Sequence, residues 1–348
     1  CALPIFDWYQ RNTNGMLAPG MQLPAVVGAS APYQNTADMR TRGWELSVNW
    51  RDQIGKVGYR VGFNLSDSQS KIVKYNSNES GILTSTLSNG STFWNYYEGK
   101  DLGEIWGYEY DGFYTVDDFT DTSSWKLKEG VPSIDGYNPR PGDVKFKNLK
   151  DDDRGTNMIS SGDNTVSNPG DRKVIGNNTP RYLYGITLGA NFKGFDLNVF
   201  MQGTGKRDAW IANNLKFPLY SDFKFIALYK DLGNYWKPVD AANGDYTAAN
   251  PNAEFPRIYG NYGNQGSNYR QSDKYLSDAS YFRIKNVTLS YTFPKAWITK
   301  ASLSQLKAFV SIENLATFSS LPKGIDPETL SWNYPAFRTV SFGLNVTL

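Results

Sequence analysis

The last stretch of the chain alternates strictly between apolar and polar positions. Apolar side chains occupy every second position from Val340 to Leu348, and polar or small residues stand between them. Successive side chains of a β-strand point to opposite faces, so this stretch predicts a strand with one apolar and one polar face. Such a strand fits the wall of a membrane barrel, which has lipid on one side and a polar lumen on the other.

The same alternation recurs along the chain, often in pairs of stretches joined by a short link, which predicts β-hairpins. About eight wall strands are expected, near residues 1–12, 39–51, 57–70, 181–192, 195–205, 279–293, 304–315 and 337–348. The last should pair with 306–313 on one edge and have no partner on its other edge within these residues. In 281–293 the apolar phase shifts near Lys285, which predicts a β-bulge or an exit from the membrane.

The lengths of the connections fall into two classes. Outer-membrane barrels have short periplasmic turns and long extracellular loops. The short links are 52–56, 191–194 and 294–304, and the long segments are 13–38, 76–180, 206–278 and 317–336. If short and long connections alternate strictly along the chain, the strand-like segment 104–114 cannot be a wall strand. It is then expected to lie in an extracellular loop. One amphipathic helix is possible around residues 222–236.

Two other classes of protein also fit an alternating pattern. The first is a passive pore or adhesin in which eight strands close by themselves. The second is a secreted, soluble, carbohydrate-binding β protein, because sandwiches alternate in the same way. Loops of about 70 and 100 residues are unusual in a compact soluble domain, which favours the barrel.

The composition of the chain excludes several classes of function. With 36 basic and 34 acidic residues the net charge is +2, so no nucleic-acid partner is expected. The chain has no histidine, which excludes a His-based triad or a His-bearing metal site, and its one cysteine excludes an internal disulfide. Aromatic residues make up 15% of the chain, which is typical of β structure. We therefore expect no enzyme and no cofactor.

Several motifs occur in an order that resembles a known family. The stretch Ser280–Pro294, SYFRIKNVTLSYTFP, resembles a signature of the SusC/RagA-type TonB-linked outer-membrane proteins. Stretches that fit the same family are Thr41–Leu46, Gly103–Phe113, Pro141–Asp143, Gly194–Leu197, Gln202-Gly203, Glu313–Leu315, Gly324–Pro327 and Arg338–Gly343. The resemblance covers nearly the whole chain and aligns it with about the last third of a family member.

The resemblance implies a 22-strand transmembrane barrel of the bacterial outer membrane, with residues 1–348 supplying about its last eight strands. The plug, the TonB box and the signal peptide would lie outside these residues. The implied activity is TonB-dependent import of glycan or peptide fragments by the SusC-like subunit of a SusCD-type complex. The implied partners are a SusD-like surface lipoprotein, TonB through the absent N-terminal part, outer-membrane lipid, and an oligosaccharide or peptide substrate.

Two kinds of candidate site follow from residue chemistry. The acidic stretch 148–155 places Asp151 and Asp153 at alternate positions, as calcium loops do, but further ligands are not evident, so no metal site is predicted. Aromatic rings can stack on the apolar faces of sugars or side chains, although rings in loops also pack the loops together or meet a partner. The candidate substrate contacts are Trp94, Tyr96, Tyr97, Trp106, Tyr108, Trp210, Tyr235 and Trp236. In contrast, Trp44, Trp50, Tyr59 and Phe63 are expected to face lipid or its interface.

Overall fold

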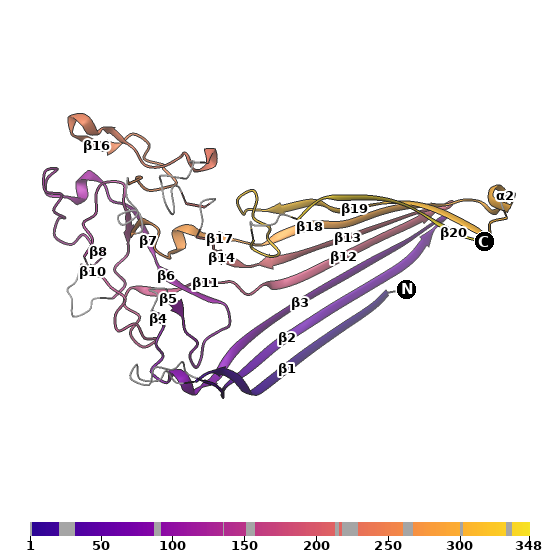
Figure 1. Ribbon diagram of the computed structural model, residues 1–348, viewed down its shortest axis with the longest axis horizontal. Helices are drawn as coiled ribbons and strands as arrows, with labels where there is room; N and C mark the ends of the chain where they lie inside the picture. Colours follow the sequence, from indigo (N-terminus) through magenta and orange to yellow (C-terminus); the bar gives the residue numbers. More distant parts are fainter. Residues whose placement is uncertain are drawn as a thin grey trace.

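The computed structural model describes residues 2–20, 32–86, 92–134, 136–150, 157–212, 216–217, 229–259, 267–299, 302–331 and 336–348. Two regions make up the molecule (Figure 1). One is a single large antiparallel sheet, called the wall sheet. The other, called the loop assembly, consists of the described parts of 76–180, 207–280 and 320–331, and it lies at one end of the wall sheet.

The wall sheet contains eight antiparallel strands in the order in which they occur along the chain. They are β1 (Ala2–Pro19), β2 (Tyr33–Ile54), β3 (Val57–Tyr75), β12 (Arg181–Phe192), β13 (Phe195–Lys206), β18 (Tyr281–Thr292), β19 (Gln305–Ser319) and β20 (Thr339–Thr347). The prediction of about eight antiparallel strands is confirmed. β20 pairs with β19 alone and β1 with β2 alone, so the sheet is open at both edges within the described residues.

Cross-strand pairs share a face, so the register divides the wall sheet into an apolar outer face and a polar inner face. On the outer face Leu188 stands between Val61 and Val199. One residue further, on the inner face, Gly189 stands between Arg60 and Asn198. The outer face has no protein cover among the described residues: the side chain of Phe342 is 81% exposed.

The shift of phase near Lys285 is a β-bulge. In β18 Ile284 pairs with Met201 and Asn286 pairs with Phe200, so Lys285 is an extra residue relative to β13. Two residues, Lys285 and Asn286, therefore separate Ile284 from Val287, whose side chains both face outward. A regular strand would have one residue there. The bulge lets the strand keep apolar residues on the outer face at both of its ends.

Aromatic side chains form two rows on the outer face. Near the loop assembly Phe282 stacks on Tyr184 and Phe318, with ring centroids 6.5 and 6.0 Å apart. At the opposite end Tyr291 contacts Phe195 and Phe293 at 4.6 and 5.1 Å. The nine steps from Phe282 to Tyr291 span about 30 Å along the strand, or about 23 Å across a membrane at a tilt near 40°. That height matches the apolar band of an outer-membrane barrel.

The two ends of the wall sheet differ as the connection lengths predicted (Figure 1). One end has tight turns at Gly55-Lys56 and Lys193-Gly194 and the short helix α2 (Lys295–Ile298). The loop assembly occupies the other end. Among the described residues no helix is long and apolar enough to cross a bilayer.

The loop assembly is built from short strands and single helical turns around its own apolar core. The strands are β4 (Thr84–Thr86), β5 (Thr92–Trp94), β6 (Glu104–Tyr108), β7 (Tyr110–Phe113), β8 (Ser133–Ile134), β9 (Val144–Phe146), β10 (Met158–Ile159), β11 (Arg172–Asn177), β14 (Asp208–Trp210), β15 (Pro238–Asp240), β16 (Asp245–Ala248) and β17 (Leu276–Asp278). The 3-10 turns are η2 (Asn76–Asn78), η3 (Val116–Asp118), η4 (Lys230–Leu232), η5 (Ala241–Asn243) and η6 (Asp273–Tyr275).

The segment 104–114 lies in the loop assembly, since β6 pairs with β11 and β7 with β9, and neither joins the wall sheet. The helix expected around 222–236 falls partly outside the described residues. Its described part, 229–236, contains only the turn η4.

Candidate functional site

The inner face of the wall sheet is the candidate functional site, because it carries charges that a lipid-facing surface would exclude. These charges include Asp7, Glu45, Arg60, Asp196, Lys307 and Glu313. Asp7 and Glu45 stand directly opposite each other, and like charges in that position repel unless water or another group screens them. The inner face is therefore suited to contact with water and polar solutes.

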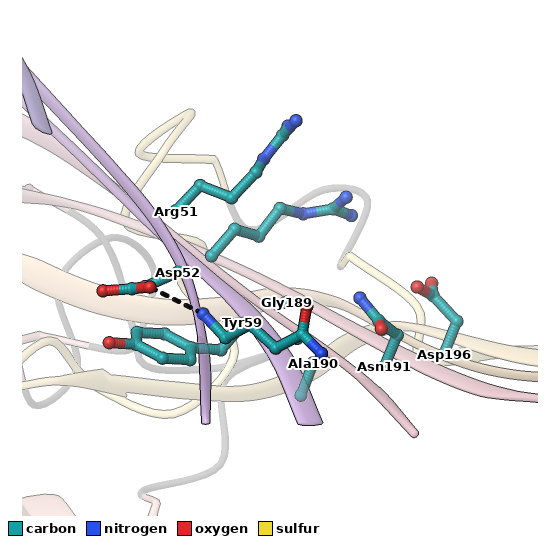
Figure 2. Close-up of a pocket in the computed structure, with 10 residues that line it drawn as sticks. Arg51, Asp52, Tyr59, Gly189, Ala190, Asn191 and Asp196 are labelled. Carbon is teal, nitrogen blue, oxygen red and sulfur yellow. Dashed lines mark hydrogen bonds between the residues drawn. The ribbon is translucent and has the colours of Figure 1, made fainter. Parts of the chain in front are cut away.

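A shallow concavity of ≈ 510 Å³ lies on the inner face near the tight turns (Figure 2). Arg51 and Arg60 line it together with Asp196. Gly189 leaves room for the Arg60 side chain, because a Cβ at Gly189 would come within 2.5 Å of Arg60 Nε. Arg60 also donates a hydrogen bond to Asn198 Oδ1. The concavity thus offers guanidinium donors to a carbonyl or carboxylate group.

At the other end of the inner face, residues 320–331 fold back onto the wall sheet, and we call this segment the strap. Its apolar side chains Leu321 and Ile325 are buried, at 9% and 6% exposure, against Ala209 and Ala279. Gly324 adopts φ +96°, which only glycine tolerates readily, at the turn. The strap closes on itself through hydrogen bonds from Asp326 N to Ser331 O and from Leu330 N to Asp326 O.

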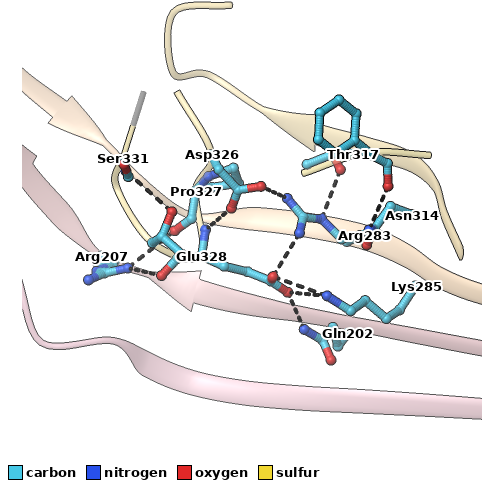
Figure 3. Close-up of polar contacts among 12 residues, drawn as sticks. Gln202, Arg207, Arg283, Lys285, Asn314, Thr317, Asp326, Pro327, Glu328 and Ser331 are labelled. Atoms are coloured by element: carbon cyan, nitrogen blue, oxygen red, sulfur yellow. Dashed lines mark hydrogen bonds and ion pairs between the residues drawn. The ribbon is translucent and has the colours of Figure 1, made fainter. Parts of the chain in front are cut away.

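Arg283 of β18 clamps the strap to the wall sheet (Figure 3). Its side chain is 2% exposed. Its guanidinium donates to Asp326 Oδ2 and Glu328 Oε2, each at 2.7 Å, and to Thr317 Oγ1 at 2.9 Å. A buried guanidinium is costly unless it is paired and hydrogen-bonded, and here two carboxylates and a hydroxyl meet it.

Three further side chains complete the clamp (Figure 3). Lys285 Nζ lies 3.1 Å from Glu328 Oε2, and Gln202 donates to the same carboxylate. Arg207 donates to the backbone oxygens of Pro327 and Glu328 at 3.2 and 3.3 Å. The side chains of Lys285 and Glu328 are 34% and 23% exposed, so the clamp presents charges of both signs beside the inner face.

Sequence reasoning located the bulge but not the clamp. Arg283 and Asp326 are 43 residues apart, and nothing in either stretch identifies the other as its partner. The available signals were an arginine inside a wall strand and the motif Gly324–Pro327, which contributes the carboxylate of Asp326. Both needed the fold to bring them together.

Most of the predicted aromatic contacts pack inside the loop assembly. Tyr97 and Trp106 are 4% and 8% exposed, and together with Trp94 they surround the fully buried Leu83. Trp106 Nε1 donates to the Tyr97 hydroxyl, which donates in turn to Glu104. Three of the eight predicted substrate contacts, Trp94, Tyr97 and Trp106, thus pack in this cluster.

Four other candidates lie in a second part of the core. Tyr108 is 9% exposed, and Trp210 and Tyr235 pack against the same cluster of buried side chains. Trp236 is 4% exposed and lies against Gly142, where a Cβ would come within 2.3 Å of its ring. Only Tyr96, at 50%, has a largely exposed side chain. Contact of these eight residues with a substrate stays a prediction.

Asp143 of the Pro-Gly-Asp motif is fully buried in the loop assembly. It accepts hydrogen bonds from the hydroxyls of Tyr137 and Tyr259, at 2.8 and 2.6 Å, and from Asn268 Nδ2 at 3.0 Å. Burial raises the pKa of the Asp143 carboxyl, against the effect of these donors. Asp143 therefore ties three segments of the loop assembly together.

A second Pro-Gly-Asp turn ends in the fully buried Asp171, which accepts from the amides of Leu149, Lys150 and Ser160. This carboxylate fixes the start of the predicted acidic stretch 148–155, of which 151–155 lie outside the described residues. Within the part of the chain that the structure describes, no group of three or more acidic or cysteine side chains could hold a metal ion.

Known proteins resemble the chain along nearly its whole length, although no family model matches it. It is 28% identical to TonB-dependent receptor P3 of Formosa agariphila over 362 residues, which cover 98% of this chain and 32% of that protein. It is 23% identical to TonB-dependent receptor SusC of Bacteroides thetaiotaomicron, with 98% of this chain and 29% of that protein covered. The chain thus spans about a third of the length of the curated relatives it matches.

Solved structures show the same fold. The RagAB peptide importer in the closed-closed state matches with a TM-score of 0.67 at 20% identity, over 99% of this chain and 33% of that chain. The importer in the open-open state matches with a TM-score of 0.64, also at 20% identity, over 100% of this chain and 33% of that one. The resemblance to SusC/RagA-type TonB-linked outer-membrane proteins is confirmed.

Proposed function

We propose that these residues form about the last eight wall strands of a larger, 22-strand outer-membrane barrel that imports glycan or peptide fragments in a TonB-dependent manner. The similarity to TonB-dependent receptors over 98% of the chain carries this proposal. An apolar outer face about 23 Å high and a charged inner face support it. The loop assembly would face the exterior, and the tight turns the periplasm.

In this mechanism the chain performs no bond chemistry. Polar groups of a passing solute would exchange hydrogen bonds with water for hydrogen bonds with the inner face, such as those offered by Arg51 and Arg60 in the concavity. The clamped strap would narrow the passage on the exterior side and present Lys285 and Glu328 to the solute. Because these groups carry both signs of charge, they suit solutes rich in hydroxyl, amide or zwitterionic groups.

The proposed partners are a SusD-like surface lipoprotein over the loop assembly and TonB, engaged through the N-terminal part of the full-length protein. The similarity to the RagAB peptide importer supports a peptide as one substrate class, and the similarity to SusC supports an assembly of the SusCD type. The protein is proposed to reside in the bacterial outer membrane.

The proposal is tested with the full-length protein in a bacterium that carries its gene. Wild-type and deletion strains receive a mixture of neutral oligosaccharides or a tryptic peptide mixture, and depletion of the medium is followed by mass spectrometry. We expect one mixture to be depleted by the wild type alone, and a protonophore to stop the depletion. Depletion that continues with the protonophore would instead support a passive pore. A tagged protein that extracts without detergent would support the soluble alternative.

A further inference from the structure

The strands β1, β2 and β3 continue on their outer face past the end of the apolar band. Three successive rows of cross-strand neighbours mark the change from apolar to charged. They are Trp8–Trp44–Asp67, then Gln10–Arg42–Gln69, then Asn12–Arg40–Lys71. The rows point to the same side of the sheet, because they lie two residues apart on each strand. We call Arg40, Arg42 and Lys71 the cationic collar.

The height of the collar matches the headgroup layer of a membrane. Two residues advance about 6.6 Å along a strand, or about 5 Å along the membrane normal at a tilt near 40°. The rows of Arg42 and Arg40 therefore lie about 5 and 10 Å beyond the row of Trp8 and Trp44. Headgroups occupy roughly 5–8 Å on each side of the hydrocarbon core, and Trp residues favour its edge. The row of Arg42 therefore falls within the headgroup layer, and the row of Arg40 and Lys71 lies just beyond it, where long side chains can reach back to the phosphates.

The nearby carboxylates offset only part of the charge of the collar. Asp67 is held by Arg181, whose Nη2 lies 2.5 Å from Asp67 Oδ2. Asp101 is 3.8 Å from Lys71 Nζ, and both side chains are 48% exposed, so water screens this pair strongly. Within the described ranges Arg40 and Arg42 form no ion pair, and the Nε of Arg42 donates to Gln10 Oε1 at 2.8 Å. Asp38, the next acidic residue of β2, accepts from the backbone of Gly15.

At the opposite end of the same strands the outer face carries no such cations, and Lys56 lies in the turn that joins β2 to β3. There the outer face of β2 ends in Trp50, Asp52 and Ile54, of which only Asp52 is charged. The excess of positive charge on the outer face of β2 is thus confined to the end that bears the loop assembly. If these cations served only to keep the ends of the strands soluble, both ends would be expected to carry them.

We propose that the cationic collar binds the phosphate groups of anionic lipid in the leaflet on the side of the loop assembly. The proposal rests on the membrane placement in the proposed function. Guanidinium groups pair with phosphate oxygens through two parallel N–H···O bonds, and Lys71 adds a point charge. The tryptophans below would pack against the glycerol or sugar region of the same lipid. Inorganic phosphate shares this recognition chemistry but lacks the acyl chains that hold a lipid at this height.

The test uses the full-length protein purified in detergent. Wild type and the triple variant R40Q/R42Q/K71Q are compared with a control, K126Q/K128Q/K230Q, which removes the same charge from exposed positions of the loop assembly. Retained phosphate-bearing lipid is counted by native mass spectrometry. We expect wild type and control to retain such lipid, and the triple variant to bind it with an affinity lower by about fivefold for each cation removed. R40K/R42K should retain more than the triple variant, because it keeps the charge.

A second readout separates lipid from free phosphate. Each protein is melted in vesicles of phosphatidylcholine, with and without phosphatidylglycerol, and in detergent with added inorganic phosphate. We expect phosphatidylglycerol to raise the melting temperature of wild type but not of the triple variant, and inorganic phosphate to have no comparable effect. Equal lipid retention by all variants, or an equal shift with inorganic phosphate, would overturn the proposal. A protein that does not enter vesicles at all would contradict the proposed function instead.

Discussion

The wall sheet and the loop assembly place their large apolar side chains in opposite ways. In the loop assembly Leu83 is fully buried and Phe146 is 2% exposed, as in the core of a soluble domain. In the wall sheet Leu344 and Phe342 are 67% and 81% exposed. The apolar residues of the wall sheet therefore need a surrounding that this part of the chain does not provide, whereas the loop assembly is held together by its own contacts.

The strap belongs to the loop assembly and is fixed to the wall sheet. Weakening this attachment should have the largest effect on stability. Replacing Arg283 by Met leaves Asp326, whose side chain is 8% exposed, without a cation and leaves Glu328 with Lys285 alone, which costs about 3–5 kcal/mol. Hydrogen exchange in the full-length protein should then show faster exchange at the amides of Asp326 and Leu330, which close the strap. The variant R283M/D326N/E328Q should recover most of the protection. Unchanged protection in R283M would mean that the apolar side of the strap holds it alone.

A matched pair of leucines compares the two regions directly. Leu83→Ala should cost about 2–5 kcal/mol in the loop assembly, because it opens a cavity between Tyr97 and Trp106. Leu344→Ala should cost about 1 kcal/mol, because it exchanges contacts with lipid or detergent only. Thermal melting followed by tryptophan fluorescence measures both. Equal costs would show that Leu344 is covered by protein in the full-length chain.

A pair of neighbouring positions on β12 compares the two faces of the wall sheet. Leu188→Arg puts a charge at mid-height on the outer face and should cost about 2–4 kcal/mol in a bilayer. Thr187→Arg, one residue away on the exposed inner face, should be tolerated because water can solvate it. Folding into vesicles across a urea series would measure the difference. The assignment of lipid and lumen faces is wrong if the two substitutions have reversed effects.

The smallest effect concerns an exposed charge cluster of the loop assembly. Lys147, whose Nζ lies 2.5 Å from Glu109 Oε1, and Lys173 lower the pKa of Glu109 from 4.5 to about 2. A lowered carboxyl pKa contributes stability above the unfolded value and loses it as the pH falls through the folded value. Between pH 4.5 and about pH 2 the wild type should therefore lose slightly more melting temperature than Glu109→Gln. Parallel melting curves in that window would show that solvent screens the cluster completely.

The wall sheet could be predicted from the sequence because alternate residues of a strand face opposite sides. The face of each residue therefore follows from its position within its own strand. Val340 and Leu344 identify their strand without knowledge of its neighbours, and even the bulge at Lys285 appears as a change of phase. The loop assembly could not be predicted in this way. Whether Trp106 packs inside or meets a solute depends on contacts with Leu83 and Tyr97, for which no periodic signal exists.

The same limit applies to the candidate site. The charges of the inner face appear in the sequence as the polar half of each strand, and that half is expected to face a polar lumen. For the segment 317–336 the sequence predicts only a long connection, because the fold of the strap depends on the pairing of Arg283 with two carboxylates beyond the next strand. Contacts at long range along the chain thus account for most of what sequence reasoning missed.

The bulge at Lys285 has a consequence for how this strand can change in evolution. Substitutions on β18 alter one side chain at a time, whereas deletion of a single residue within a regular part of the strand turns every side chain beyond it to the other face. The bulge is the exception: without Lys285, the residues Ile284, Asn286 and Val287 would alternate regularly, and both ends of the strand would keep their present faces. Length at this point should accordingly be more variable than elsewhere on the strand. A deletion scan of the Ser280–Pro294 stretch, scored for barrel assembly, would find its best tolerated single-residue deletion on β18 at Lys285 or Asn286.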